Sequence, residues 1–247
     1  MSLGEKIYLY CERGHDPAFW AEPLNAVSNA AFVIAALAAA KEYAALPPER
    51  RSPAAAAALV GLTFVIGIGS FLFHTYATRW ALLADTVPIA LFMVAYVAFV
   101  LRRFMGLHWI VVGLGVVAFY AAARYAGTIQ CSYGELLPIT ARSGARCLNG
   151  TVAYAPALLA LVGAAVVLAA HPAGRAMALA SVIFLMSMTV RTLDLELCEL
   201  SRFGGHLRGS HFLWHGLNGW MLFILLRAAI RHGGPNSSAP GGGEVRT

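Results

Sequence analysis

Seven long apolar stretches alternate with short polar segments along the chain. Each stretch has roughly 20 residues, the length that an α-helix needs to cross the hydrocarbon core of a bilayer. The stretches run approximately over 23–43, 55–76, 81–101, 107–126, 151–170, 174–193 and 209–231. Helices are expected because every backbone polar group must be satisfied inside a membrane. The pattern predicts an all-α membrane protein, a seven-transmembrane helix bundle.

Prolines, glycines and charges mark the breaks between these stretches. The longest expected loop is 131–147, and a polar hairpin at 191–209 precedes the last helix. The predicted organisation is a seven-helix transmembrane domain over 1–231 and a disordered cytoplasmic tail over 232–247, which is rich in Gly, Pro and Ser. No cleavable signal peptide is expected, because the first apolar run follows mixed residues without a basic start.

Composition supports the membrane assignment. Hydrophobic residues make up 59% of the chain and charged residues 12%, against about 25% charged in a soluble domain. The mean hydropathy is +0.68. A net charge of +6 without Lys/Arg clusters among aromatics gives no reason to expect nucleic-acid binding. Composition indicates no oligomeric state.

The cysteines orient the predicted bundle. The 18 Lys and Arg residues divide equally between its two sides, so the positive-inside rule does not choose between them. All four cysteines lie on the N-terminal side, which suggests two disulfides in an oxidising compartment. Cys131–Cys147 would close the long loop and Cys11–Cys198 would tie the N-terminal segment to the hairpin, although the sequence is compatible with other pairings. The N-terminus is therefore expected on the extracytoplasmic side and the C-terminus in the cytoplasm.

Polar residues gather in one half of the predicted membrane. Ionisable groups within spans are costly and usually functional. Because the helices alternate in direction, the polar residues all fall in the outer half: Glu22, Asn25, Ser28, Asn29, Ser70, His74, Asp85, Asp194, His211, His215 and Asn218. This convergence indicates a single site beneath the extracytoplasmic surface.

Three histidines of this group have the spacing of metal ligands. His211 and His215 are four residues apart and share a helix face. Together with His74 they could hold a zinc ion with one coordination position open, as catalytic zinc requires. The alternative is that such histidines only bond neighbouring helices, and an HxxxH spacing alone is a weak signal.

The neighbouring polar residues have the types that attack of water on a carbonyl group needs. Asp85 could act as general base and then general acid beside a zinc-activated water. Ser70 could donate a hydrogen bond to the developing oxyanion, and Tyr154 is a further candidate for the same role.

Three sequence blocks resemble the alkaline ceramidase family. They are "AEPLNAVSNAAFV" (21–33), "GSFLFHTYATRWALLADTVP" (69–88) and "SHFLWHGLNGW" (210–220). The second block is the most specific, because its Ser, His, Asp and Pro follow at fixed intervals. The family belongs to a superfamily of seven-helix membrane hydrolases that also includes adiponectin-type receptors. The resemblance covers about residues 10–225, and the region around 125–150 matches poorly.

The resemblance implies an amidase that cleaves ceramide into a sphingoid base and a fatty acid. By position, His74, His211 and His215 match the family's zinc ligands, Ser70 its oxyanion-stabilising serine, Asp85 its water-activating aspartate, and Cys11 and Cys198 a family disulfide. Some animal members also bind calcium near the N-terminus. Here Glu12 and Glu22 match two of those ligands, whereas Leu9 replaces a leading aspartate.

The sequence therefore predicts a zinc-dependent amidase for ceramide or a related N-acyl lipid, with Zn²⁺ and a candidate Ca²⁺ as cofactors. The alternative is a receptor or lipid-binding protein of the same superfamily, with a structural or weakly hydrolytic zinc site. A structural site is usually closed by four protein ligands. A proton or ion transporter would instead carry polar residues into the inner half of its helices, where very few are found.

Overall fold

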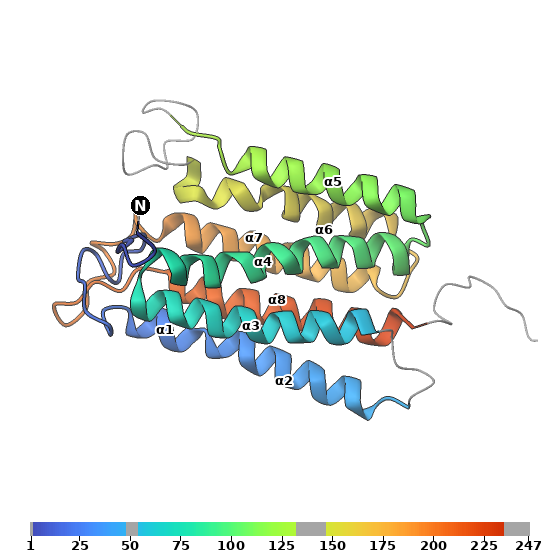
Figure 1. The fold of residues 1–247 in the computed structure, drawn as a ribbon, viewed down its shortest axis with the longest axis horizontal. Coiled ribbons are helices and arrows are strands. Elements are labelled where there is room, and N and C mark those ends of the chain that lie inside the picture. The colour runs from blue at the N-terminus through green and yellow to red at the C-terminus, as the bar shows by residue number, and fades with distance from the viewer. Residues whose placement is uncertain (1, 48–53, 132–146, 235–247) are drawn as a thin grey trace, which may run out of the picture.

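A computed structural model describes residues 2–47, 54–131 and 147–234 as a bundle of long helices that run side by side (Figure 1). Seven helical spans are long and apolar enough to cross a membrane, which confirms the predicted fold class. The helices are α1 (Pro23–Ser28), α2 (Ala30–Ala45), α3 (Ala54–Tyr76), α4 (Arg79–Phe99), α5 (Trp109–Ala126), α6 (Ala155–Val167), α7 (Gly174–Leu193) and α8 (His211–His232). The described residues form no β-strand.

The observed spans agree with the apolar stretches, with shifts of a few residues at their ends. Helix α4 continues through a π-helical turn, Val100–Phe104, and a 3-10 segment, Cys147–Tyr154, precedes α6. The first span divides into α1 and α2 at Asn29, whose side-chain amide donates to the carbonyl of Asn25 at 2.7 Å. The expected tail from 235 onward and the middle of the long loop, 132–146, lie outside the described residues.

Helix α8 is the central helix of the bundle. In its most apolar window 61% of the residues are buried, against 11% for α5 and for the span Cys147–Val167. Helix α8 packs against α7 and α2, and α3 packs against α4 and α2. Figure 1 shows α5 and α6 along one edge. Polar side chains at the start of α8 are consequently enclosed by protein rather than by lipid.

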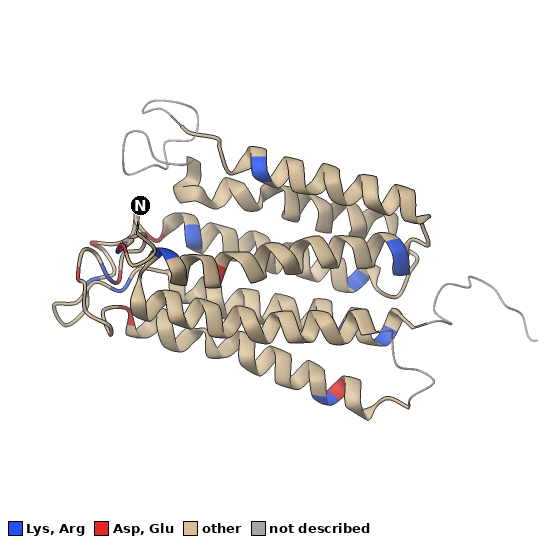
Figure 2. Ribbon diagram, viewed as in Figure 1, with Lys and Arg blue, Asp and Glu red and all other residues tan. Residues whose placement is uncertain are grey.

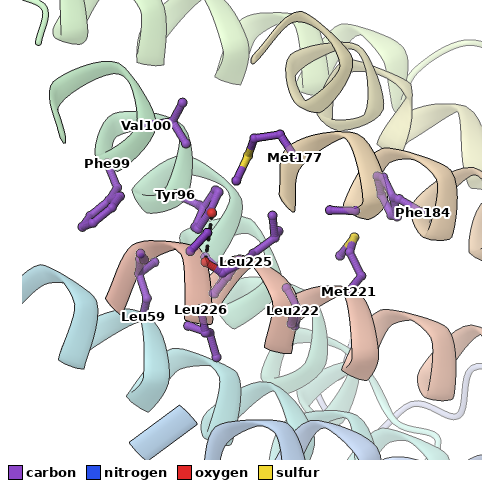
Figure 3. Close-up of a cluster of buried hydrophobic side chains, with 14 of the residues drawn as sticks. Leu59, Tyr96, Phe99, Val100, Met177, Phe184, Met221, Leu222, Leu225 and Leu226 are labelled. Carbon is purple, nitrogen blue, oxygen red and sulfur yellow. Dashed lines mark hydrogen bonds between the residues drawn. The ribbon is translucent and has the colours of Figure 1, made fainter. Parts of the chain in front are cut away.

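The core around the middle of α8 is apolar. Leu59, Met177, Leu222 and Leu226 contribute buried side chains to it (Figure 3). The buried hydroxyl of Tyr96 donates to the carbonyl of Leu225 at 3.0 Å, so its polar atom is satisfied, as burial requires.

A glycine brings α3 and α4 into close contact beside the polar residues. A Cβ atom at Gly69 would overlap the carbonyl of Ala84 in α4. The absence of a side chain therefore lets the two backbones meet, and it places Ser70 next to Asp85.

The N-terminal segment folds over one end of the bundle, beside the loop between α7 and α8 (Figure 1). The disulfide Cys11–Cys198 joins the two, and Cys131 pairs with Cys147, so both proposed pairings are confirmed. Charged residues gather mainly at the two ends of the bundle (Figure 2). This distribution is typical of a protein whose middle lies in lipid.

Candidate metal centre and adjoining cavity

Three buried histidines meet at the end of the bundle that the N-terminal segment covers. His74 lies in the last turn of α3, and His211 and His215 lie in the first turns of α8. Their ring centroids are 4.7 to 5.2 Å apart. One potential ligand atom of each lies within 4.8 Å of the others, a group that could hold a metal ion. The three histidines that the sequence spacing singled out therefore lie together in the structure.

Two of the imidazoles are oriented by hydrogen bonds at Nδ1. Nδ1 of His74 lies 2.5 Å from Oε2 of Glu22. Nδ1 of His215 lies 2.7 Å from the hydroxyl of Ser28, and this hydroxyl lies 2.9 Å from the carbonyl of Asn25. Because a hydroxyl has one hydrogen and gives it to that carbonyl, Nδ1 of His215 is the donor to Ser28. Both rings then turn Nε2 toward the shared space, because a hydrogen-bond partner at one ring nitrogen fixes the orientation of a metal-binding histidine.

The Nε2 atom of His74 is buried without a hydrogen-bond partner in the described structure, as is Nδ1 of His211. Buried polar atoms are almost always paired in proteins, so unpaired ones need an explanation. Imidazole nitrogens are common zinc ligands. The donor set and the two unpaired nitrogens fit a metal ion.

Tyr10 covers the ring of His211. The two rings are stacked with centroids 3.6 Å apart, and the hydroxyl of Tyr10 interacts with Arg191 of α7. Burial raises the pKa of the Tyr10 hydroxyl, so it remains protonated. Sequence reasoning did not select Tyr10, because an aromatic residue in a loop carries no periodic signal.

Ser70 and Asp85 lie in contact beside the histidines. Both are buried, and the hydroxyl of Ser70 interacts with the carboxyl group of Asp85. Asp85 is also close enough to His74 for a direct electrostatic interaction. Its Oδ1 atom is buried and has no hydrogen-bond partner in the described residues. A carboxylate with one unpaired oxygen beside the imidazoles can accept a proton.

Tyr154 lies next to the histidine group rather than within it. Its ring centroid is 5.0 Å from that of Trp214, and the guanidinium of Arg191 lies 5.5 Å from the centroid of each ring. The structure therefore places Tyr154 at the boundary between the polar site and the apolar interior.

Asp194 fixes the start of α8. Its carboxylate accepts from the backbone N–H groups of Ser210 and His211 at 2.8 and 2.9 Å, and from that of Cys11 at 2.9 Å. Burial raises the pKa of Asp194, although these donors and Arg191 oppose the shift. A carboxylate at a helix N-terminus satisfies donors that lack intrahelical partners. Asp194 thereby holds both α8, which carries His211 and His215, and the N-terminal segment that carries Tyr10.

Glu12 and Glu22 are not arranged as calcium ligands. Both oxygens of Glu12 accept from the backbone N–H groups of Leu24 and Asn25 at the start of α1. Glu22 accepts from Arg13 with one oxygen, and from His74 and Asn25 with the other. Burial alone would raise the pKa of Glu22, but His74 and Arg13 lower it below its ordinary value. Because all four oxygens already have donors, the residues present do not fit the expected calcium site.

An apolar cavity of about 250 Å³ begins beside the histidines and extends between α4, α5, α6, α7 and α8. Phe32 and Trp214 line it, and their rings lie 6.0 Å from His215 and 6.3 Å from His211. Its deeper wall includes Tyr96 and Leu225, which Figure 3 shows. Such a cavity suits a hydrocarbon chain with a polar end at the histidines.

The sequence model of the family described as Ceramidase matches residues 9–236, which is most of the chain. None of the curated proteins matches this chain.

Proposed function

The chain belongs to the ceramidase family, and we propose that it is a zinc-dependent amidase that cleaves the N-acyl bond of ceramide or a related N-acyl lipid. Family membership supports a membrane hydrolase that acts on amides. The observation that carries the zinc proposal is the group of three buried histidines at the end of the bundle. The products are a free fatty acid and a sphingoid base or other amine.

His74, His211 and His215 would hold the zinc ion. The group contains no fourth His, Cys, Asp or Glu within the described residues, whereas structural zinc sites are usually closed by four protein ligands. Bound zinc would supply an activated water and polarise the amide carbonyl. The ligand count therefore favours chemistry over a structural role.

Asp85 and Ser70 would carry out the proton transfer and the charge stabilisation. Asp85 accepts the proton of the attacking water at its carboxylate and delivers it to the leaving amine nitrogen. Ser70 donates a hydrogen bond to the carbonyl oxygen as negative charge develops there. The unpaired Oδ1 of Asp85 supports its role as proton acceptor, and the position of Ser70 beside Asp85 puts its hydroxyl close to the same site.

The apolar cavity would hold the acyl chain. Phe32 and Trp214 lie between the histidines and the deeper wall, so a chain that passes them leaves its amide at the metal centre. Tyr154 would contact the substrate where the cavity meets the polar site. Both disulfides lie on the N-terminal side, which supports an extracytoplasmic active site and a cytoplasmic C-terminus.

Purified protein in lipid nanodiscs tests this function. Fatty-acid release from ceramide is measured by mass spectrometry, with zinc content determined on the same samples. His215→Ala is expected to lose zinc and activity, and Asp85→Asn to keep zinc and lose activity. His206→Ala and Glu199→Gln change exposed residues and should behave as the wild type.

A chelator should abolish hydrolysis, and added zinc should restore it. If zinc is retained but no N-acyl lipid is hydrolysed, the receptor alternative is favoured. If His215→Ala keeps full zinc and full activity, the proposed site is wrong.

A further inference from the structure

Arg13 is a buried arginine whose five N–H groups all have acceptors. Its side chain has a relative exposure of 0%. Nε donates to Oε1 of Glu22 at 2.5 Å. Nη1 donates to the carbonyls of Asp16 and Ala18 at 3.1 and 2.7 Å, and Nη2 to those of His74 and Thr75 at 2.9 and 3.2 Å. Arginine has five N–H donors, so the guanidinium is fully paired.

These acceptors come from three segments that meet at the metal centre. Asp16 and Ala18 belong to the N-terminal segment, and Glu22 precedes α1. The carbonyls of His74 and Thr75 belong to the last turn of α3, where carbonyls lack intrahelical donors and attract positive charge. Arg13 thus joins the N-terminal segment to the two helix ends that lie against the site.

The acceptors form an oxygen cage around a positive charge. Calcium prefers six to eight carboxylate, carbonyl and water oxygens, and the five acceptors of Arg13 are one carboxylate and four carbonyl oxygens. The guanidinium fills this cage with a covalently attached cation. The other oxygen of Glu22 remains directed at His74.

We propose that Arg13 replaces a divalent cation at this position: its guanidinium holds Glu22 against His74 and makes the metal centre independent of calcium. Arg13 is a positioning residue, since it acts on His74 through Glu22 and through the α3 carbonyl of His74 itself. The proposal rests on the proposed function only for the identity of the metal that His74 binds.

Two measurements on the wild-type protein test whether its metal centre is independent of calcium. The thermal unfolding midpoint in detergent is measured with millimolar calcium and with a calcium-selective chelator, and calcium binding is measured by equilibrium dialysis. We expect the same midpoint in both conditions and no saturable binding. A calcium-dependent rise in the midpoint, or binding of one calcium per protein, would overturn the proposal even if every Arg13 variant failed to fold.

Variants of Arg13 test the positioning role through zinc affinity. Arg13→Ala should weaken zinc binding by about 10- to 100-fold, because Glu22 loses the charged partner that holds it against His74. It should also acquire a stabilising response to calcium, because Glu22 and the four carbonyls are left without their cation. Arg13→Lys has fewer donors and no fork, so its zinc affinity should lie between those of Arg13→Ala and the wild type.

Arg202→Ala is the matched control, since Arg202 forms an exposed ion pair with Glu199 at the same end of the bundle. It should change neither zinc affinity nor the response to calcium. Wild-type zinc affinity in Arg13→Ala would refute the positioning role. Failure of the wild type to bind zinc would refute the proposed function. The calcium measurements would still decide whether Arg13 replaces a divalent cation.

Discussion

Glu22 accepts a hydrogen bond from Nδ1 of His74 at 2.5 Å, although the two residues lie 52 positions apart in the sequence. Glu22 directly precedes α1, whereas His74 lies in the last turn of α3. The contact fixes the plane of the imidazole and directs Nε2 toward His211 and His215. The glutamate is thereby part of the metal centre without belonging to the set of ligands.

Replacement of Glu22 should therefore weaken zinc binding while the three histidines remain. We expect Glu22→Gln to lower zinc affinity by about 10- to 100-fold, because the neutral amide is a weaker acceptor for Nδ1–H. Competition with a chromogenic zinc chelator measures this change. Glu5→Gln removes an exposed partner of Arg79 at the same end of the bundle and should leave the affinity unchanged. Equal zinc affinity in both variants would contradict the assigned role of Glu22.

Ser28 plays the corresponding part for His215. Its hydroxyl oxygen accepts from Nδ1 at 2.7 Å, so Ser28→Ala should lower zinc affinity. The loss should be smaller than that of Glu22→Gln, because Ser28 is a neutral acceptor whereas Glu22 is a charged one. Ser181→Ala is a suitable control, since it removes a buried hydroxyl of α7 that bonds only the carbonyl of Met177. A Ser28→Ala protein with unchanged zinc affinity would show that Ser28 serves only helix packing.

The apolar cavity should set the length of the acyl chain. Ala164 is a buried residue of α6 that lines this cavity. A phenylalanine at this position would fill part of the volume, so Ala164→Phe should shift hydrolysis toward substrates with shorter acyl chains. Competition between ceramides of different chain length, followed by mass spectrometry, measures the shift. Ala118→Phe places the same side chain on the exposed face of α5 and should keep the wild-type preference. Identical preferences in the two variants would place the acyl chain elsewhere.

Gly209 is required where the α7–α8 loop meets the N-terminal segment. It has a φ of +65°, and a Cβ atom there would collide with the carboxylate of Asp194. Gly209→Ala should therefore lower both the thermal unfolding midpoint and zinc affinity, because Asp194 holds the start of α8. Gly204 has a similar φ of +61° but open space around it. Gly204→Ala should cost only the backbone strain, about 1–2 kcal/mol, and should keep zinc affinity. Equal losses in both variants would mean that the contact with Asp194 has no separate effect.

The sequence predicts the helices and the histidine group for physical reasons that act locally. A bilayer demands about 20 apolar residues per span, so the seven stretches are recognisable without knowledge of packing. The four-residue spacing puts His211 and His215 on one face of α8, and alternating helix directions bring them to the same depth as His74. These features depend on periodicity and length alone.

The surroundings of the histidines could not be predicted in the same way. The sequence pattern places Glu22 in a calcium site, because nothing in it shows that Arg13 pairs with this carboxylate. Arg13 and Tyr10 lie in an irregular segment whose path depends on Cys198 and Asp194, far along the chain. Long-range contacts of a loop leave no periodic trace.

The central claim is that three histidines hold one zinc ion with an open coordination position. X-ray absorption at the zinc edge of the purified wild-type protein tests it most directly. We predict three imidazole nitrogens and one oxygen at about 2.0–2.1 Å from the metal. Sulfur among the ligands, a fourth imidazole, or the absence of zinc from active protein would contradict it.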